Sequence, residues 1–476
     1  MIRASRIRAL AALVLALGHP GILPASGAES ARMRPDPEIR RTGALPDPLD
    51  PGTFLDTALA LSGGTPEEAG RARAALAGAL RAFRETFPGP EDPAARAESL
   101  LEFLHTDLLR SYVENQTRVD TALLTGDFNC VSSAILYAYL AKETGLEVSG
   151  VRTTDHALCA VEVPGRSVDV ETTNRYGFDP GSKKEFLDSF GRTTGYVYVP
   201  PSRKDARRMI GDREFLGLIL SNRIAELERK GRWEEAVGLA FDYDALVGGK
   251  VARDFLLDRI SNLVAGRHGR NDWDGAFAAL DAAEDALGPS SRVSELRAAT
   301  ALASLSWFGS RRDWTGGLDY ARRLPASAAA DPRVAQIART LAEGLLRDSV
   351  RTLPFGDAVR AVEDARESGV LDPRSRAELL EYLYGTEANA VAKRSGWLAG
   401  IPVLEEGLAR VPGSSALAAA RGLFRSNWTA ESHNRFAALY NAGKFEEAAR
   451  VLKESLARDP RNPTLLRDLE TLRKTR

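Results

Sequence analysis

A cysteine and a histidine carry the clearest chemical potential in this sequence. Cys130 ends the stretch GDFNC, directly before the apolar helical pattern VSSAILYAYL. If Asn129 is the N-cap, the thiol lies in the first turn of a helix, where unpaired N–H groups and the helix dipole favour a thiolate. His156 follows 26 residues later at the start of a predicted strand. This order predicts a thiol nucleophile with an imidazole as its proton shuttle.

A carboxylate would complete such a site by accepting the second imidazole N–H and fixing the tautomer. Asp169 lies in the middle of the run SVDVET, which we expect to pair with the strand that follows His156. Glu171 shares a strand face with Asp169 and is the alternative orienting residue. His105 is set in a helical leucine pattern and is expected to be a packed, satisfied histidine.

The second cysteine leaves two other interpretations of Cys130 open. In an oxidising compartment Cys130 and Cys159 could form a disulfide, or Cys130 could be an inert core residue. Side chains alternate across a strand, however, so Cys159, three residues after His156, is expected to face away from it. Cys159 is therefore predicted to be a small buried hydrophobe.

Three stretches resemble the transglutaminase-like branch of the papain-like thiol enzymes: NCVSSAILYAYLAKETGLEVSGV, DHALCAVEV and SVDVETTN. The resemblance covers roughly residues 95 to 200. It implies that Cys130 is the nucleophile, His156 the general base and acid, and Asp169 the orienting carboxylate. The backbone N–H of Cys130 would be one oxyanion donor, and Gln116 and Asn129 are weak candidates for another.

The elements expected around these residues form an α+β domain over residues 53–212. Residues 54–113 have a helical pattern, and three β-like runs follow at 147–153, 156–163 and 167–172. Pro164-Gly165 reads as a tight turn between the last two runs. Helices followed by an antiparallel sheet are typical of the α+β class.

From residue 213 to 476 the β signal disappears and a helical repeat takes over. An aromatic residue followed three positions later by Ala or Gly recurs six times, at Trp233, Trp273, Trp314, Phe355, Trp397 and Phe445. A period near 40 residues corresponds to two helices with their turns. Residues 226–240 and 437–462 are similar to tetratricopeptide repeats (TPR), so we expect an all-α TPR-like solenoid that binds a protein or peptide.

The N-terminus predicts export. Residues 1–28 have three arginines followed by the apolar run ALAALVLAL and small residues before Glu29, as in a signal peptide. Residues 29–52 are read as a Pro-rich linker. We expect a bacterial periplasmic or secreted protein without a membrane span.

Composition excludes other classes of function. The formal net charge is −1, with no basic block that would track phosphates, so nucleic acid is not an expected partner. No residue spacing indicates a metal site or an organic cofactor.

Together these features predict an exported transglutaminase-like thiol enzyme. It would hydrolyse or transfer amide or peptide acyl groups through a Cys-His-Asp triad, and its helical repeats would recognise protein. The alternative is a periplasmic helical-repeat scaffold whose front domain keeps the fold without turnover.

Overall fold

The computed structural model describes residues 31–87, 92–181 and 183–475. Its chain forms two compact units, which contain residues 31–300 and 301–475 of the described part. The predicted signal peptide lies outside the described residues. No helix within the described ranges is both long and apolar enough to cross a bilayer, as expected from the sequence.

Helices fill the N-terminal part of the first unit: α2 (Pro37–Gly43), α3 (Pro51–Ser62), α4 (Pro66–Thr86) and α5 (Pro93–Phe103). Each begins with a proline, which suits the first helical position because its missing N–H would have no partner there. The segment predicted to be a linker is therefore partly helical. Its Arg32 forms an ion pair with Asp242 at 2.5 Å, and α2 packs against α10.

An antiparallel sheet follows, with strand order β5-β4-β3-β6. The three predicted strands are confirmed as β3 (Val148–Thr153), β4 (Ala157–Val163) and β5 (Arg166–Val170). The fourth, β6 (Arg207–Ile210), was not predicted and pairs with β3 at the edge. Two short strands, β1 (Ser111–Tyr112) and β2 (Asp127–Phe128), pair in parallel just before the cysteine.

The helix α7 (Cys130–Glu143) is the centre of this unit. It packs against β3 and β4, and its side chains from Cys130 to Ala141 are all buried. The π-helix η1 (Leu104–Leu108) and the short helix α6 (Val119–Thr125) precede it, and α8 (Lys184–Thr194) follows the sheet. Burial on every side explains why the sequence of α7 is apolar throughout rather than on one face only.

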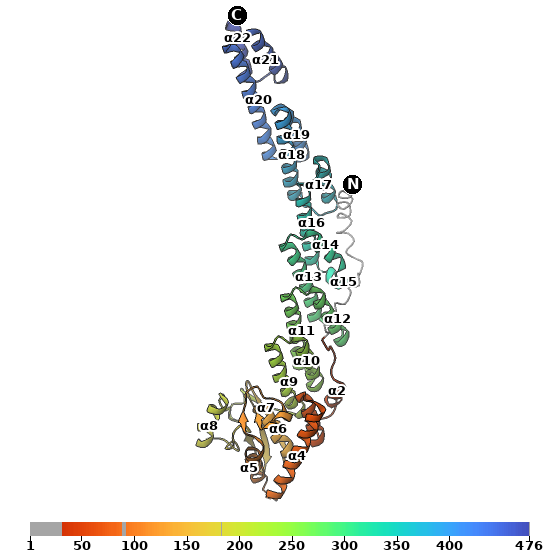
Figure 1. The fold of residues 1–476 in the computed structure, drawn as a ribbon, viewed down its shortest axis with the longest axis vertical. Helices are drawn as coiled ribbons and strands as arrows, with labels where there is room; N and C mark the ends of the chain where they lie inside the picture. The colour runs from red at the N-terminus through yellow and green to blue at the C-terminus, as the bar shows by residue number, and fades with distance from the viewer. Residues whose placement is uncertain (1–30, 88–91, 182, 476) are drawn as a thin grey trace. The chain divides into compact units, whose positions relative to one another are not determined.

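The helical region begins with α9 (Asp212–Arg229), α10 (Trp233–Val247), α11 (Gly249–Gly269) and α12 (Trp273–Leu287) (Figure 1). The expected domain boundary at residue 212 differs from the structure, because α9 shares one hydrophobic core with α7. Gly150 allows β3 to pack closely against α9, because a Cβ atom at this position would lie 2.6 Å from the Phe215 ring. The first two repeats are thus part of the front unit.

The remaining helices are α13 (Ser291–Ser310), α14 (Trp314–Arg323), α15 (Ala326–Ala329), α16 (Pro332–Ser349), α17 (Phe355–Glu367), α18 (Pro373–Ser395), α19 (Trp397–Arg410), α20 (Ser415–Asn441), α21 (Phe445–Arg458) and α22 (Pro463–Thr475). All six predicted aromatic residues open a helix. In the second unit Gly407 of α19 packs against Tyr384 of α18, so a small residue allows close helix contact. The predicted helical region with successive packed helices is confirmed.

Candidate active site

The structure places Cys130 at the first position of α7, as predicted, with Asn129 as the N-cap. The Asn129 Oδ1 atom accepts hydrogen bonds from the backbone N–H groups of Val131 and Ser132 at 3.0 and 3.1 Å. Ser132 Oγ accepts from the Asn129 N–H at 2.9 Å, which completes a capping box. Within the described chain no group accepts from the Cys130 N–H, so it can face a ligand.

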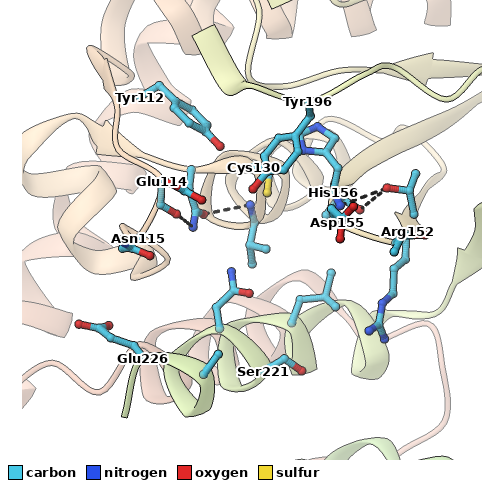
Figure 2. Close-up of a pocket in the computed structure, with 18 of the residues that line it drawn as sticks. Tyr112, Glu114, Asn115, Cys130, Arg152, Asp155, His156, Tyr196, Ser221 and Glu226 are labelled. Carbon is cyan, nitrogen blue, oxygen red and sulfur yellow. Dashed lines mark hydrogen bonds between the residues drawn. The ribbon is translucent and has the colours of Figure 1, made fainter. Parts of the chain in front are cut away.

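His156 lies in the turn between β3 and β4, where its N–H donates to Thr153 Oγ1 at 3.1 Å. Its ring nitrogen Nε2 is 2.7 Å from Glu171 Oε2. The other nitrogen, Nδ1, is buried without an oxygen or nitrogen partner among the described residues, and we infer that it faces the Cys130 thiol (Figure 2). Cys130 and His156 therefore line the same pocket.

The charge state of His156 follows from its two neighbours. Burial by itself lowers the pKa of an imidazole. Here the negative charge of Glu171, its hydrogen bond to the ring and the interaction with Cys130 outweigh burial and raise the pKa of His156 to about 10. The ring is therefore an imidazolium at neutral pH.

Glu171 holds the imidazole in place. Its side chain is fully buried, and its second oxygen, Oε1, accepts hydrogen bonds from the N–H and Oγ1–H of Thr173 at 3.1 and 2.7 Å. These bonds fix both carboxylate oxygens. Glu171, the alternative considered from the sequence, is therefore the residue that orients His156.

Asp169 is not in contact with His156, contrary to the prediction. It lies on the opposite face of the sheet, where Arg207 binds its two oxygens at 2.6 and 2.7 Å. The Tyr198 hydroxyl also donates to it, and burial followed by this contact raises the pKa of Tyr198. β5 ends at Val170 and the chain turns, so Glu171 leaves the face that strict alternation assigned to it.

The two weak oxyanion candidates have structural roles instead. Gln116 Nε2 donates to the carbonyl oxygens of Arg118 and Asp127 at 2.9 and 3.0 Å. Asn129 Nδ2 donates to the carbonyl oxygen of Glu114 at 3.0 Å. Both amides stabilise the loop before α7. Gln116 uses both of its N–H donors there, and Asn129 uses one of its two.

Tyr112 is a site residue that the sequence analysis missed. It is half-buried in the pocket beside Cys130, and its hydroxyl has no hydrogen-bond partner in the described part of the chain. Burial and then the negative charge at Cys130 raise the pKa of Tyr112, so the hydroxyl keeps its proton and remains a donor. The pairing of β1 with β2 positions Tyr112. Each of these strands has only two residues, so the sequence pattern did not indicate them.

The second cysteine lies apart from this chemistry. Both cysteines are free thiols, and the Cys159 thiol donates to the Ala134 carbonyl oxygen at 3.2 Å. Burial raises the pKa of Cys159 well above its ordinary value. Cys159 faces α7, the helix that carries Cys130, so the alternation argument placed it on the wrong side; His156 precedes β4, and the strand's periodicity does not include it.

His105 supports the site from behind, as a packed histidine. Its Nε2 atom is 3.0 Å from the carbonyl oxygen of Thr172, next to Glu171. Burial lowers the pKa of His105 to about 4, so the ring is neutral and donates this hydrogen bond at pH 7. Thr172 is also tied to α7, since its hydroxyl lies 2.8 Å from the Ser133 hydroxyl.

Cys130 and His156 line a pocket of about 250 Å³, and Glu171 lies buried behind His156 (Figure 2). The segment after β1, the β3–β4 turn and one face of α9 form its walls. Aromatic rings confine His156: Phe190 of α8 lies 5.4 Å and Tyr196 5.3 Å from it, between ring centroids. The pocket therefore gives a ligand access to the sulfur while the imidazole stays fixed.

Among the described residues no group of three or more His, Cys, Asp or Glu side chains could hold a metal ion. Comparisons of the chain with protein-family models, with curated proteins and with solved structures found no match.

Proposed function

We propose that this chain is an exported thiol enzyme that cleaves or transfers the acyl groups of amides or peptides. The observation that supports this most is the buried relay from Cys130 through His156 to Glu171, which opens into a pocket. A structural histidine has no need of a buried carboxylate on one ring nitrogen while the other is left without an oxygen or nitrogen partner. The arrangement is the one that a charged thiolate–imidazolium pair requires.

The chemistry follows from the positions of these groups. The Cys130 thiolate attacks the carbonyl carbon, and the oxyanion that forms accepts hydrogen bonds from the Cys130 N–H and the Tyr112 hydroxyl. His156 Nδ1–H gives its proton to the leaving amine, which breaks the C–N bond and leaves a thioester. Neutral His156 then takes a proton from water or a second amine, which attacks the thioester and releases the thiol.

The expectations from the family resemblance, the helical repeats and the N-terminal residues are also part of this proposal. The resemblance to transglutaminase-like enzymes supports the assignment of Cys130 and His156, with Glu171 in the orienting role in place of Asp169. The helical repeats, similar to tetratricopeptide repeats, offer surface for a protein or peptide partner. The N-terminal signal-like residues support location in the periplasm or outside the cell.

The test is the pH dependence of Cys130 alkylation by iodoacetamide, followed by mass spectrometry of the labelled peptide. We expect Cys130 to react at pH 6 faster than a free cysteine, and His156→Ala to abolish this advantage. His105→Gln is the matched control, because it changes a buried histidine outside the relay. A wild-type thiol that reacts at pH 6 no faster than free cysteine would favour the scaffold alternative.

A further inference from the structure

Two acidic side chains in the pocket have no partner. Glu114 follows β1, and Asp155 lies in the β3–β4 turn beside His156; both line the pocket and both are exposed. Neither carboxylate has a hydrogen bond or ion pair with any described residue, because the bond at Glu114 involves only its backbone oxygen. In Figure 2 they lie on different sides of Cys130.

Two of the other charged groups of the pocket have ion-pair partners. Arg152 lies 3.5 Å from Glu214, whereas Arg229 donates only to the neutral Asn115 Oδ1 at 2.9 Å and keeps its positive charge. Glu226 forms an ion pair with Lys230 at 2.5 Å. Engaged charges contribute less to the field that a ligand meets than free ones do. Among the described lining residues, Glu114 and Asp155 are thus two negative charges without an ion pair, against one such positive charge, Arg229.

The raised pKa of the Tyr196 hydroxyl is consistent with a negative electrostatic potential in the pocket. Tyr196 lines the same pocket and contacts the His156 ring. Burial raises the pKa of Tyr196, and the negative charges of Cys130, Glu114 and Asp155 raise it further. His156 offers a second feature that points to a ligand: it lines the same pocket, and its buried Nδ1 has no oxygen or nitrogen partner among the described residues.

We propose that Glu114 and Asp155 select substrates that carry a positive charge next to the scissile carbonyl, such as basic peptides, and disfavour anionic ones. This inference rests on the proposed thiol chemistry, because it assigns specificity to the same pocket. The two carboxylates attract a cationic group as it approaches, and they repel an anionic group from the sulfur. They are specificity residues, and neither takes part in a bond-making step.

Two thiol reagents of opposite charge test the inference on the full chain. The cationic reagent is 2-aminoethyl methanethiosulfonate, and the anionic one is 2-sulfonatoethyl methanethiosulfonate. With either, the thiolate attacks the sulfenyl sulfur, a mixed disulfide forms and methanesulfinate leaves. Each rate at Cys130 is divided by the rate with N-acetylcysteine amide, which removes the intrinsic difference between the reagents.

We expect the corrected rate to be about tenfold higher for the cationic reagent at low salt, and the preference to shrink as salt screens the charges. The double variant E114Q/D155N should lose most of this preference. The matched control is Glu162→Gln, an exposed carboxylate on β4 outside the pocket, which should leave the preference unchanged.

The two proposals fail in different ways. Equal corrected rates at a thiol whose reactivity depends on His156 would overturn the charge selection and leave the enzyme proposal standing. A preference for the anionic reagent would also overturn it and would assign the field to Arg152 and Arg229. A thiol that is insensitive to His156→Ala would overturn the enzyme proposal itself, whatever the ratio of rates.

Discussion

Replacing Glu171 by Gln tests whether the charge of Glu171, and not only its packing, sets the protonation of His156. Gln keeps the size of the side chain and an oxygen that accepts from His156 Nε2–H, but it removes the negative charge. The pKa of His156 is about 10 against an ordinary 6.5, although burial alone would lower it. This rise corresponds to roughly 5 kcal/mol, at about 1.4 kcal/mol per pH unit.

Glu171 and Cys130 together provide this energy and also offset the opposite effect of burial. If they contribute comparably, the loss of the Glu171 charge removes at least about 2 to 3 kcal/mol, and the pKa of His156 falls by at least about two pH units. The thiolate–imidazolium pair then persists over a narrower pH range. At pH 9 the imidazolium would be largely lost in Glu171→Gln but largely retained in the wild type.

The assay is an NMR titration of the His156 ring nitrogens, with iodoacetamide rates at Cys130 measured over the same pH range. The control is Asp169→Asn, which removes a buried charge two residues away that is bound to Arg207 on the other face of the sheet. It should lower stability by about 3 to 5 kcal/mol and leave the His156 titration unchanged. If Asp169→Asn shifts the titration and Glu171→Gln does not, our assignment is wrong.

Three further predictions concern neighbouring groups. Tyr112→Phe should slow acyl transfer from p-nitrophenyl acetate by about 10²-fold, as expected for one oxyanion donor, without slowing iodoacetamide alkylation of Cys130; equal losses in both assays would contradict the role. Thiol titration should find two free thiols in denaturant and only Cys130 in the native state, because Cys159 is buried; no thiol in denaturant would indicate a disulfide. The pKa of His105 is lowered to about 4 from 6.5, so its contribution to stability is complete above about pH 6.5 and lost as the pH falls toward 4. Urea unfolding should show a loss of about 3 kcal/mol over this range, and His105→Gln should lack that component.

Local signals were sufficient for several parts of the structure. The polar residue before an apolar helical run placed Cys130 at the start of α7. The alternating runs and the Pro164-Gly165 turn predicted β3, β4 and β5. The aromatic residues spaced near 40 residues apart predicted where the second helix of each pair begins. All of these depend on short-range preferences, which the sequence expresses directly.

Other features were missed because they depend on contacts between distant segments. β6 is short and polar, and it forms only because β3 offers a free edge. Without it, the sequence had no partner for Asp169, which therefore seemed free to bind the imidazole. The first helical hairpin was assigned to a separate domain, although α9 packs on the same core as α7.

The sequence by itself determined which residue types face each other in this protein: a thiol at a helix start, an imidazole after a turn and acids on the next strand. Only the tertiary structure decided that Glu171, and not Asp169, holds the imidazole. The reason is that the strand ends at Val170, so the Glu171 side chain reaches His156 while Arg207 binds the Asp169 carboxylate on the other face. Where a strand stops depends on the contacts of its neighbours, and a local pattern does not encode them.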